Sequence, residues 1–165
     1  MSALTYLLMK SQRAHCILLN KNNIMQYGYI LINEIPTGLK FDIYVCGLEP
    51  YSYHGFHVHY GNDITKGCDA LGGHFNPTNQ NHGNFNEFQA HFGDLGNLVA
   101  DENGTVKKIL ISKFLSLSKK KSSIMNRSLI LHADRDDLGQ GGNKESLITG
   151  NSGKRIMCGV IRSIS

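Results

Sequence analysis

Histidine is the residue type whose number and spacing in this sequence most clearly indicate chemistry. The chain has 8 histidines among 165 residues. His57 and His59 are separated by one residue in an apolar run that predicts a strand. Residues i and i+2 of a strand point to the same face of a sheet. Both imidazoles are therefore expected to address one point, while Val58 faces the other side. Alone, such a pair is a weak signal, since surface or core histidines are more common than ligands.

A second group of metal-ligating side chains follows in the irregular segment after this strand. Three imidazoles and one carboxylate complete a tetrahedral donor set for Zn²⁺, an ion that accepts nitrogen and oxygen. The set is His74, His82, His91 and Asp94. Turn-forming residues between the first two histidines can bend the chain back on itself. We therefore favour a zinc site over histidines that are present by chance in a polar loop.

His132 ends the apolar run 129–131 and has two interpretations. A buried strand histidine with one satisfied hydrogen bond is the ordinary one. The alternative is that it joins His57 and His59 across the sheet. A fourth nitrogen, from His74 or another loop histidine, would then complete the roughly square-planar environment that Cu(II) favours.

Short strands are the elements expected to position these residues. Eight apolar or alternating runs, separated by turn residues, predict strands. They cover residues 16–19, 27–32, 41–45, 56–59, 95–100, 106–111, 129–132 and 156–161. Residues 101–104 predict a hairpin turn between the fifth and sixth strands. The segments 60–93 and 133–154 lack periodicity, and long loops of this kind are usually functional. The pattern predicts a small antiparallel sandwich or barrel with two long loops.

Length and composition exclude several classes of protein. The 165 residues, 41% of them hydrophobic, predict one packed domain. No apolar run approaches the roughly 18 residues of a membrane span, and residues 4–9 are too short and lack the basic start of a secretory signal. We therefore expect a cytoplasmic protein without a membrane partner. The net charge is +4, but the basic run Lys119–Lys121 has no interleaved aromatic residues, which favours a solvated loop over a nucleic-acid surface.

Four cysteines are present, and their spacing alone does not settle how they pair. They are Cys16, Cys46, Cys68 and Cys158. In a cytosolic setting, free thiols are the first expectation.

Several glycine- and histidine-containing motifs occur in a fixed order from Gly55 onward. They are Gly55-Phe56-His57-Val58-His59, Gly67-Cys68, Gly72-x-His74-Phe75-Asn76-Pro77, His82-Gly83, His91-x-Gly93-Asp94-Leu95-Gly96-Asn97, His132-x-x-x-Asp136-Asp137-Leu138-Gly139-x-Gly141-Gly142-Asn143 and Thr149-Gly150-Asn151-x-Gly153-x-Arg155-x-x-Cys158-Gly159-Val160-Ile161. Together they resemble copper/zinc superoxide dismutase, from about Arg13 to the carboxyl end.

The resemblance implies a fold and an activity. The fold is all-β, an eight-stranded antiparallel Greek-key sandwich or barrel of immunoglobulin-like type with two long functional loops. Residues 12–165 form the single domain, and residues 1–11 are an extension. The activity is dismutation of superoxide to dioxygen and hydrogen peroxide, an antioxidant defence, by alternate reduction and reoxidation of copper. One copper and one zinc ion per subunit are the implied cofactors.

The resemblance also implies residue roles. It assigns copper to His57, His59, His74 and His132, and zinc to His74, His82, His91 and Asp94, so that His74 is an imidazolate bridge and carries a proton in the reaction. Asp136 links His57 to His82 by hydrogen bonds. Cys68 and Cys158 form a disulfide, which leaves Cys16 and Cys46 as free, buried thiols. In the substrate channel, Arg155 docks the superoxide anion and Thr149 lines the wall.

Some positions depart from the family pattern. Lys144 stands where an acidic residue is common and Ile148 where a lysine is common. We therefore expect electrostatic steering of the substrate by a different arrangement of charged residues. No proline follows Arg155, which predicts that a copper chaperone is dispensable. The segments that form the dimer contact in many relatives stay partly apolar, which favours a homodimer. A viral source would place the enzyme in the host cytoplasm.

Three other functions compete with this one. A copper carrier of the same fold usually lacks some ligands or the channel arginine, and both are present here. A zinc hydrolase needs an open zinc position, whereas the four expected ligands close it. A nucleic-acid binder rests on the short lysine run alone.

Overall fold

The structure, a computed structural model, describes residues 12–20, 22 and 25–164, and the expected extension 1–11 lies outside them. The strands are β1 (Arg13–Leu19), β2 (Tyr27–Ile35), β3 (Gly38–Cys46), β4 (Tyr53–His59), β5 (Asp94–Val99), β6 (Val106–Ser112), β7 (Ser128–His132), β8 (Arg155–Val160) and β9 (Arg162–Ser163). The predicted eight-stranded antiparallel fold is confirmed, and β9 is a short addition that pairs with β1.

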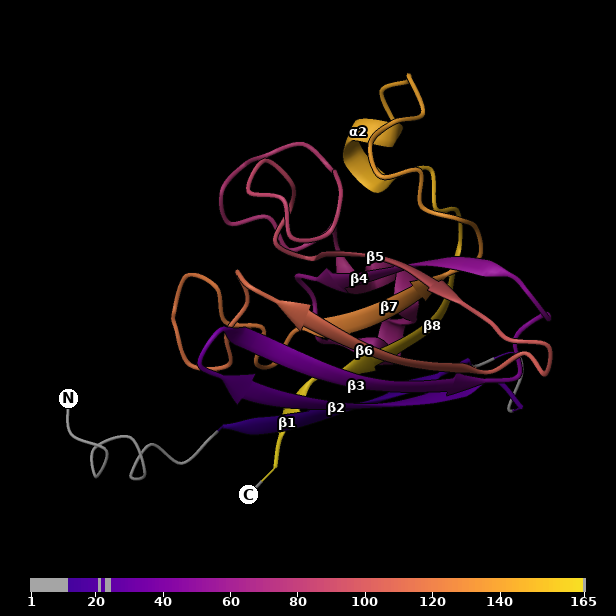
Figure 1. Cartoon of the computed structure of the whole chain (residues 1–165), viewed down its shortest axis with the longest axis horizontal. Helices are drawn as coiled ribbons and strands as arrows, with labels where there is room; N and C mark the ends of the chain where they lie inside the picture. Colours follow the sequence, from indigo (N-terminus) through magenta and orange to yellow (C-terminus); the bar gives the residue numbers. More distant parts are fainter. Residues whose placement is uncertain (1–11, 21, 23–24, 165) are drawn as a thin grey trace.

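The two long loops are also confirmed, and both contain short helical turns. These are η1 (Ile64–Lys66), η2 (Cys68–Leu71) and α2 (Ser146–Thr149). Figure 1 shows the loop that carries α2 and the loop before β5 rising from the same side of the strands. Among the described residues, none of the helices has the length and apolar character that a bilayer span requires.

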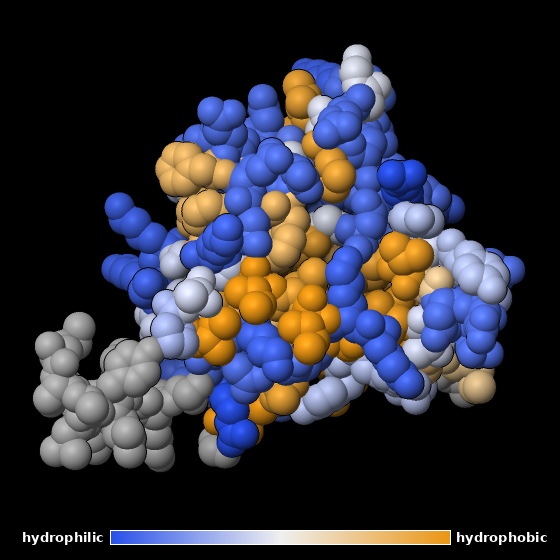
Figure 2. All heavy atoms as spheres, in the orientation of Figure 1, coloured by the Kyte–Doolittle hydropathy of each residue, from blue (hydrophilic) through white to orange (hydrophobic). Residues whose placement is uncertain are grey.

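The strands form a nearly closed Greek-key barrel. Their order is β5-β4-β7-β8-β1-β2-β3-β6. Three of the pairings, β4 with β7, β8 with β1 and β3 with β6, join strands that are not consecutive in the sequence. Residues 101–104 form the predicted turn, with Gly104 N–H donating to the carbonyl of Asp101 at 3.1 Å. The predicted hairpin is wrong, because the strands joined by this turn, β5 and β6, are the two ends of the strand order rather than a hydrogen-bonded pair. Figure 2 shows apolar side chains at the surface over these strands, which include Val99, Ile109 and Ile111.

The core follows the alternation of the strands. In β3, Leu39, Phe41, Ile43 and Val45 are buried, and the residues between them are half-buried. Strand β4 differs, since every residue from His54 to His59 is buried. Phe56 and Val58 belong to the apolar core, while His57 and His59, which alternate with them, face the opposite side. The long loops cover that side, so the strand is buried on both faces.

Register shifts occur beside the histidines. The β4–β5 ladder shifts between Gly55 and His57, and the β7–β8 ladder shifts between Leu131 and His132. Such irregularities bend a strand and redirect a side chain. Two strands therefore leave regular pairing where their histidines converge.

A disulfide joins η2 to β8. Cys68 and Cys158 are bonded across a sequence separation of 90 residues, with a Cα–Cα distance of 5.7 Å. The other two thiols are free, as expected, but only Cys16 is buried, whereas Cys46 is partly exposed. Cys46 lies on the half-covered outer side of β3 and not in the core.

We expect the double substitution Cys68→Ser, Cys158→Ser to lower the free energy of unfolding by about 4–5 kcal/mol, because the bond closes a long loop in the unfolded chain. Urea unfolding without reductant measures this loss. Cys46→Ser is the matched control, because it removes a free thiol. A double variant as stable as this control would contradict the expectation.

Candidate metal centre

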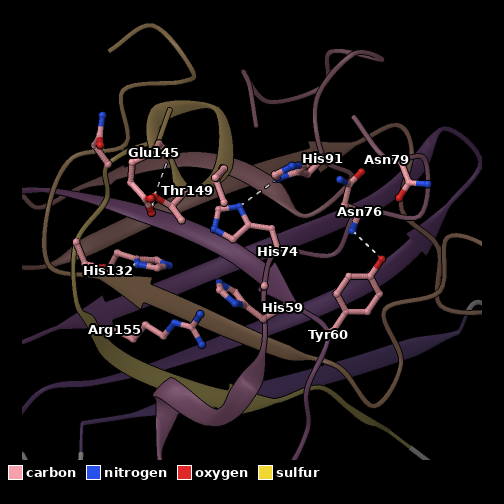
Figure 3. Close-up of a pocket in the computed structure, with 14 residues that line it drawn as sticks. His59, Tyr60, His74, Asn76, Asn79, His91, His132, Glu145, Thr149 and Arg155 are labelled. Carbon is pink, nitrogen blue, oxygen red and sulfur yellow. Dashed lines mark hydrogen bonds between the residues drawn. The ribbon is translucent and has the colours of Figure 1, made fainter. Parts of the chain in front are cut away.

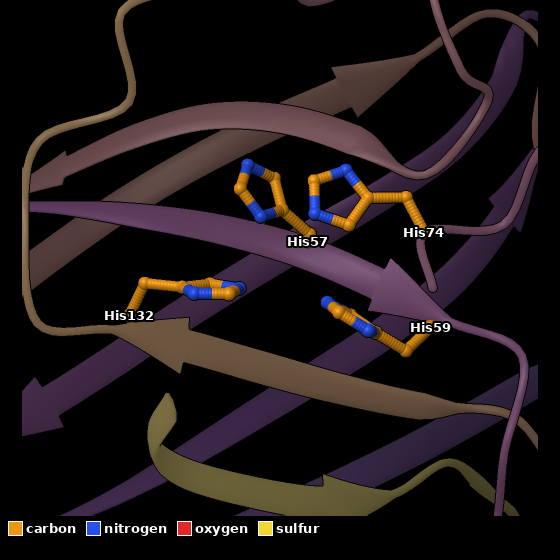
Figure 4. Close-up of side chains that lie close together, drawn as sticks. All are labelled: His57, His59, His74 and His132. Atoms are coloured by element: carbon orange, nitrogen blue, oxygen red, sulfur yellow. The ribbon is translucent and has the colours of Figure 1, made fainter. Parts of the chain in front are cut away.

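Four buried histidines meet at one point above the strands (Figure 4). His57 and His59 come from β4, His132 from the end of β7, and His74 from the loop after η2. The His57 and His74 ring centroids are 4.1 Å apart, and those of His57 and His132 are 4.9 Å apart. One nitrogen from each of the four rings lies within 4.8 Å of the others. The structure therefore joins His132 to the strand pair and supplies the fourth nitrogen from His74.

Backbone pairing brings the His74 loop against β4. Phe75 N–H donates to the carbonyl of Val58 at 2.8 Å, and Tyr60 N–H donates to the carbonyl of Gly73 at 3.1 Å. His59 and His74 thus lie opposite each other in an isolated antiparallel bridge. The loop acts locally as an extra short strand, which fixes the position of the His74 ring.

Each of these four rings has one nitrogen without a hydrogen-bond partner among the described residues. The unpartnered atoms are His57 Nδ1, His59 Nε2, His74 Nε2 and His132 Nε2, all buried. The opposite nitrogens of His59 and His132 contact the carbonyl oxygens of Gly72 (2.9 Å) and Gly153 (3.1 Å). A ring N–H that donates to a carbonyl leaves a lone pair on the other nitrogen. Buried polar atoms are rarely left unpaired, so this set fits a cation that binds four nitrogens, as Cu(II) does.

These imidazoles stay neutral, which is the form that binds metals. Burial, with the neighbouring His74 as a second cause, lowers the pKa of His57 to about 3. Burial also lowers the pKa of His132 to about 4 and holds that of His59 well below its usual value. Protons therefore do not compete for these sites near neutral pH.

The second donor set surrounds Asp94. The Nδ1 atoms of His74, His82 and His91 lie 2.8, 3.0 and 3.2 Å from its Oδ1 atom. Backbone N–H groups of Gly83 (3.0 Å) and His91 (3.1 Å) donate to its Oδ2 atom, which turns Oδ1 toward the three rings. Ligands at about 2.0–2.1 Å around a tetrahedral zinc ion lie about 3.3 Å from one another. The observed separations are close to this value, so the donor set fits zinc.

Distance alone also places a nitrogen of His57 near His74, His82 and Asp94. His91 is the better fourth member, because its Nδ1 lies 3.4 Å from Nδ1 of His74 and 3.2 Å from Asp94. The Nε2 atom of His57 is already engaged by Asp136. His74 belongs to both sets and offers a different nitrogen to each.

Asp136 links the two sets. Its Oδ2 lies 2.8 Å from His57 Nε2, and its Oδ1 lies 2.7 Å from His82 Nε2. Burial raises the pKa of Asp136, but the two imidazoles outweigh it and hold the pKa below its usual value. Burial likewise lowers the pKa of His82, yet Asp136 and Asp94 raise it to about 9. The carboxylates of Asp94 and Asp136 both contact the His82 ring, so positive charge is favoured at this position.

Two residues that support Asp136 had no role in the sequence analysis. Asn97 exchanges hydrogen bonds of 2.8 and 2.9 Å with the backbone of Asp136. Gly150, at φ 68°, passes so close that a Cβ would collide with Asp136 Oδ1 and His82 Nε2. Both lie inside the quoted motifs, and only the pairing of distant segments reveals what they contact.

A pocket of about 590 Å³ opens onto the four-nitrogen set (Figure 3). His59, His74 and His132 line it, whereas His57 is not part of its wall. Thr149 and Arg155 also line it. The two terminal guanidinium nitrogens of Arg155 donate to the carbonyls of Cys68 (2.9 Å) and Gly72 (2.6 Å), next to the disulfide.

The wall of the pocket carries one acidic and one basic side chain, Glu145 and Arg155. Glu145 and Ile148 lie on its wall, and Oγ1 of Thr149 donates to Oε1 of Glu145 at 2.9 Å. Burial lowers the pKa of Arg155, while Asp69 raises it, and the guanidinium stays charged at any ordinary pH. Alongside burial, Arg155 helps to lower the pKa values of His59 and His132, so the positive charge of the lining lies beside these histidines.

Comparisons with known proteins agree with this geometry. The family model described as copper/zinc superoxide dismutase matches residues 26–161. The chain is 45% identical over 134 residues to a Cu-Zn superoxide dismutase of Paramecium bursaria Chlorella virus 1, which covers 81% of this chain and 71% of that protein. It is 48% identical over 117 residues to Cu-Zn superoxide dismutase 3 of Arabidopsis thaliana, covering 71% and 70% of the two chains.

Other similar proteins include an extracellular Cu-Zn superoxide dismutase of Brugia pahangi, 49% identical over 120 residues, which cover 71% of this chain and 59% of that one. Among solved structures, the crystal structure of the clock protein EA4 superposes with a TM-score of 0.87 at 35% identity, over 95% of this chain and 98% of that chain.

We expect Asp136→Asn to weaken zinc binding by about 10–100-fold, as removal of a residue that orients metal ligands commonly does. An amide accepts a hydrogen bond through one atom only, so one of the two rings loses its partner. Chelator competition measures the affinity. Asp134→Asn, which neutralises an exposed carboxylate two residues away, is the control. Equal zinc affinity in both variants would contradict the role of Asp136.

Proposed function

Because this chain belongs to the copper/zinc superoxide dismutase family, whose activity converts superoxide to dioxygen and hydrogen peroxide, we propose which of its own side chains carry each part of that reaction. The activity and the two cofactors follow from the family together with the two donor sets. The observation that carries the residue assignment is the set of four unpartnered, buried nitrogens, three of them on histidines that line the pocket.

Copper binds at this four-nitrogen set, and zinc binds at the set around Asp94. Their members are His57, His59, His74 and His132 for copper, and His74, His82, His91 and Asp94 for zinc. Copper supplies the one-electron redox chemistry when bound, and zinc supplies a fixed positive charge beside it. The opposed directions of the two nitrogens of His74 support its assignment to both ions.

His74 holds and moves the proton. An imidazole loses both ring protons only when cations lie on both sides of it. Its Nε2 atom has no protein partner among the described residues and its ring lines the pocket, so a proton taken up there can be passed to a substrate oxygen. Its Nδ1 atom stays directed at Asp94, 2.8 Å away, which keeps the ring in place throughout.

Arg155 binds and orients the substrate anion. The carbonyls of Cys68, Asp69 and Gly72 accept hydrogen bonds from its two terminal nitrogens at 2.9, 3.3 and 2.6 Å. These bonds fix the guanidinium plane, and its remaining N–H groups are available to a small anion. Thr149 lines the same pocket. A small anion therefore meets both a donor and a positive charge beside His59 and His132.

We further propose a homodimer in which a copper chaperone is dispensable. Ile156, rather than proline, follows Arg155. The contact would use the segments around Tyr60, Gly61, Met125, Asn126 and Arg162. Tyr60 is 45% exposed, which leaves this part of the surface available to a partner.

The proposed location is the cytoplasm, or the host cytoplasm for a viral source. The free thiols of Cys16 and Cys46 support it, because reducing compartments keep cysteines unpaired. The similar proteins include a viral and an extracellular enzyme, so fractionation of the source cell is the direct test.

We expect Arg155→Ala to keep both metals but to lower turnover by about tenfold or more, the usual effect of removing a positioned donor. Metal analysis and a superoxide-consumption assay measure the two quantities. Arg135→Ala, which removes an exposed arginine near Tyr53, is the control. Unchanged turnover, or a loss of bound copper of about tenfold, would contradict the assignment.

We expect activity to fall as ionic strength rises, because a net charge of +4 and Arg155 attract the anionic substrate and salt screens this attraction beyond about 10 Å at 0.1 M. A salt series at constant pH measures the effect. A flat or rising profile would show that charge does not steer the substrate.

We expect sedimentation to give twice the chain mass of 18.3 kDa for the metal-loaded protein. Arg162→Glu, which reverses charge in the proposed contact, should shift the mass toward the monomer. A monomer mass for the unmodified protein at all concentrations would rule out the homodimer.

A further inference from the structure

The side chain of Asn86 connects the zinc loop, which is the segment between η2 and β5 that carries His74, His82 and His91, to the edge of the barrel. Its Nδ2 atom donates to the carbonyl of Ile111 at 2.8 Å, and its Oδ1 atom accepts from the N–H of Lys113 at 2.9 Å. Asn86 lies between His82 and His91, which belong to the donor set around Asp94. The stretch of the loop between the two histidines is thus attached near its middle to the end of β6.

The edge of the barrel explains why an asparagine suits this position. Strand β6 pairs with β3 on one side and is the last strand in the order, so within the described chain no strand pairs with its other side. The carbonyl of Ile111 and the N–H of Lys113 would otherwise be unpaired edge groups. A carboxamide carries one donor and one acceptor group side by side, as a peptide does. Asn86 therefore pairs with the edge as a short strand would.

The backbone of Asn86 is adapted to this contact. Its φ is 62°, in the left-handed region that asparagine tolerates better than most residues. This conformation reverses the chain at the turn over Asn84–Glu87, where Glu87 N–H donates to the carbonyl of Asn84 at 3.3 Å.

Aromatic packing provides a second attachment to the same stretch of chain. Phe114 follows Lys113, and its ring stacks on Phe92 at 5.5 Å and meets Phe88 edge-on at 6.0 Å. Phe92 is the neighbour of His91 in sequence. The loop on the carboxyl side of Asn86 is therefore held against residues 111–114 by side chains as well.

We propose that Asn86 is a positioning residue for zinc: its hydrogen bonds to Ile111 of β6 and to Lys113, just after the strand, hold His82 and His91 at Asp94 before the ion binds. The proposal rests on the zinc set given above. A donor set held in place by surrounding contacts binds its ion more tightly, because binding then does not have to supply the free energy that ordering the loop costs. Asn86 touches neither the ion nor a ligand, so it acts through the loop.

The test compares zinc release from the fully loaded enzyme into excess chelator. Asn86→Gly removes the carboxamide but keeps the left-handed backbone accessible, and we expect release about tenfold faster, within the range known for residues that support metal ligands. Asn86→Asp keeps the acceptor and loses the donor, so its rate of zinc release should lie between those of the wild-type protein and Asn86→Gly. Asn79→Gly is the matched control, because Asn79 is in the same loop at φ 54° and its side chain makes no hydrogen bond within the described chain.

Hydrogen exchange of the Lys113 amide gives a readout that does not depend on metal. Exchange should be faster in Asn86→Gly and unchanged in Asn79→Gly, because only the first variant removes the acceptor. Together with faster zinc release, this result would support the proposal.

Three results would overturn it. Zinc release at the wild-type rate in Asn86→Gly would do so, even if the melting temperature fell, since the contact would then serve stability alone. Equal acceleration in Asn79→Gly would assign the effect to general loosening of the loop, and an unchanged Lys113 amide would show that the hydrogen bond is absent. If the unmodified protein held no zinc, or if His82→Ala released zinc at the wild-type rate, the zinc set itself would fail instead.

Discussion

The imidazole of His74 is the interaction on which the rest of the site depends, because it is shared by two donor sets. Its Nδ1 atom lies 2.8 Å from Asp94, and its Nε2 atom joins three other buried nitrogens that have no partner among the described residues. A buried polar atom left unpaired costs about 1–3 kcal/mol. A fold that keeps four of them together, with their opposite nitrogens held by hydrogen bonds, is built for cations.

Strands position some of the metal-ligating side chains, and loops position the others. Strands β4 and β7 supply three rings in fixed register, and irregular pairing at Gly55 and at Leu131 redirects them. The loops supply the rest and are fixed by tertiary contacts instead of a ladder. Asp136 joins the sets, the disulfide holds the segment whose carbonyls orient Arg155, and Asn86 attaches the zinc loop to β6. Loop residues thereby reach the precision that catalysis requires.

Period-2 alternation was enough to predict the eight strands and the common direction of His57 and His59, because these features depend on local sequence. The pairing of β5 with β6 was predicted wrongly, since barrel closure depends on strands far apart in the chain. Spacing could not choose the fourth nitrogen, because a loop of this length can place several histidines in the same position. His54 illustrates the difficulty: it is buried in the same strand, yet it contacts the carbonyl of His132 and the hydroxyl of Ser52 instead of the site. The motifs of the family supplied what spacing could not, except for Asn86 and Asn97, whose partners are visible only in three dimensions.

Diffraction from crystals of the oxidised, fully metal-loaded protein, with anomalous data at the copper and zinc edges, would show which ion each nitrogen of His74 binds. We expect copper bonded to Nε2 of His74 and zinc bonded to Nδ1, each at about 2.0–2.2 Å. A map in which either ion lies beyond bonding distance of this ring, or in which both ions lie next to the same ring nitrogen, would contradict this expectation.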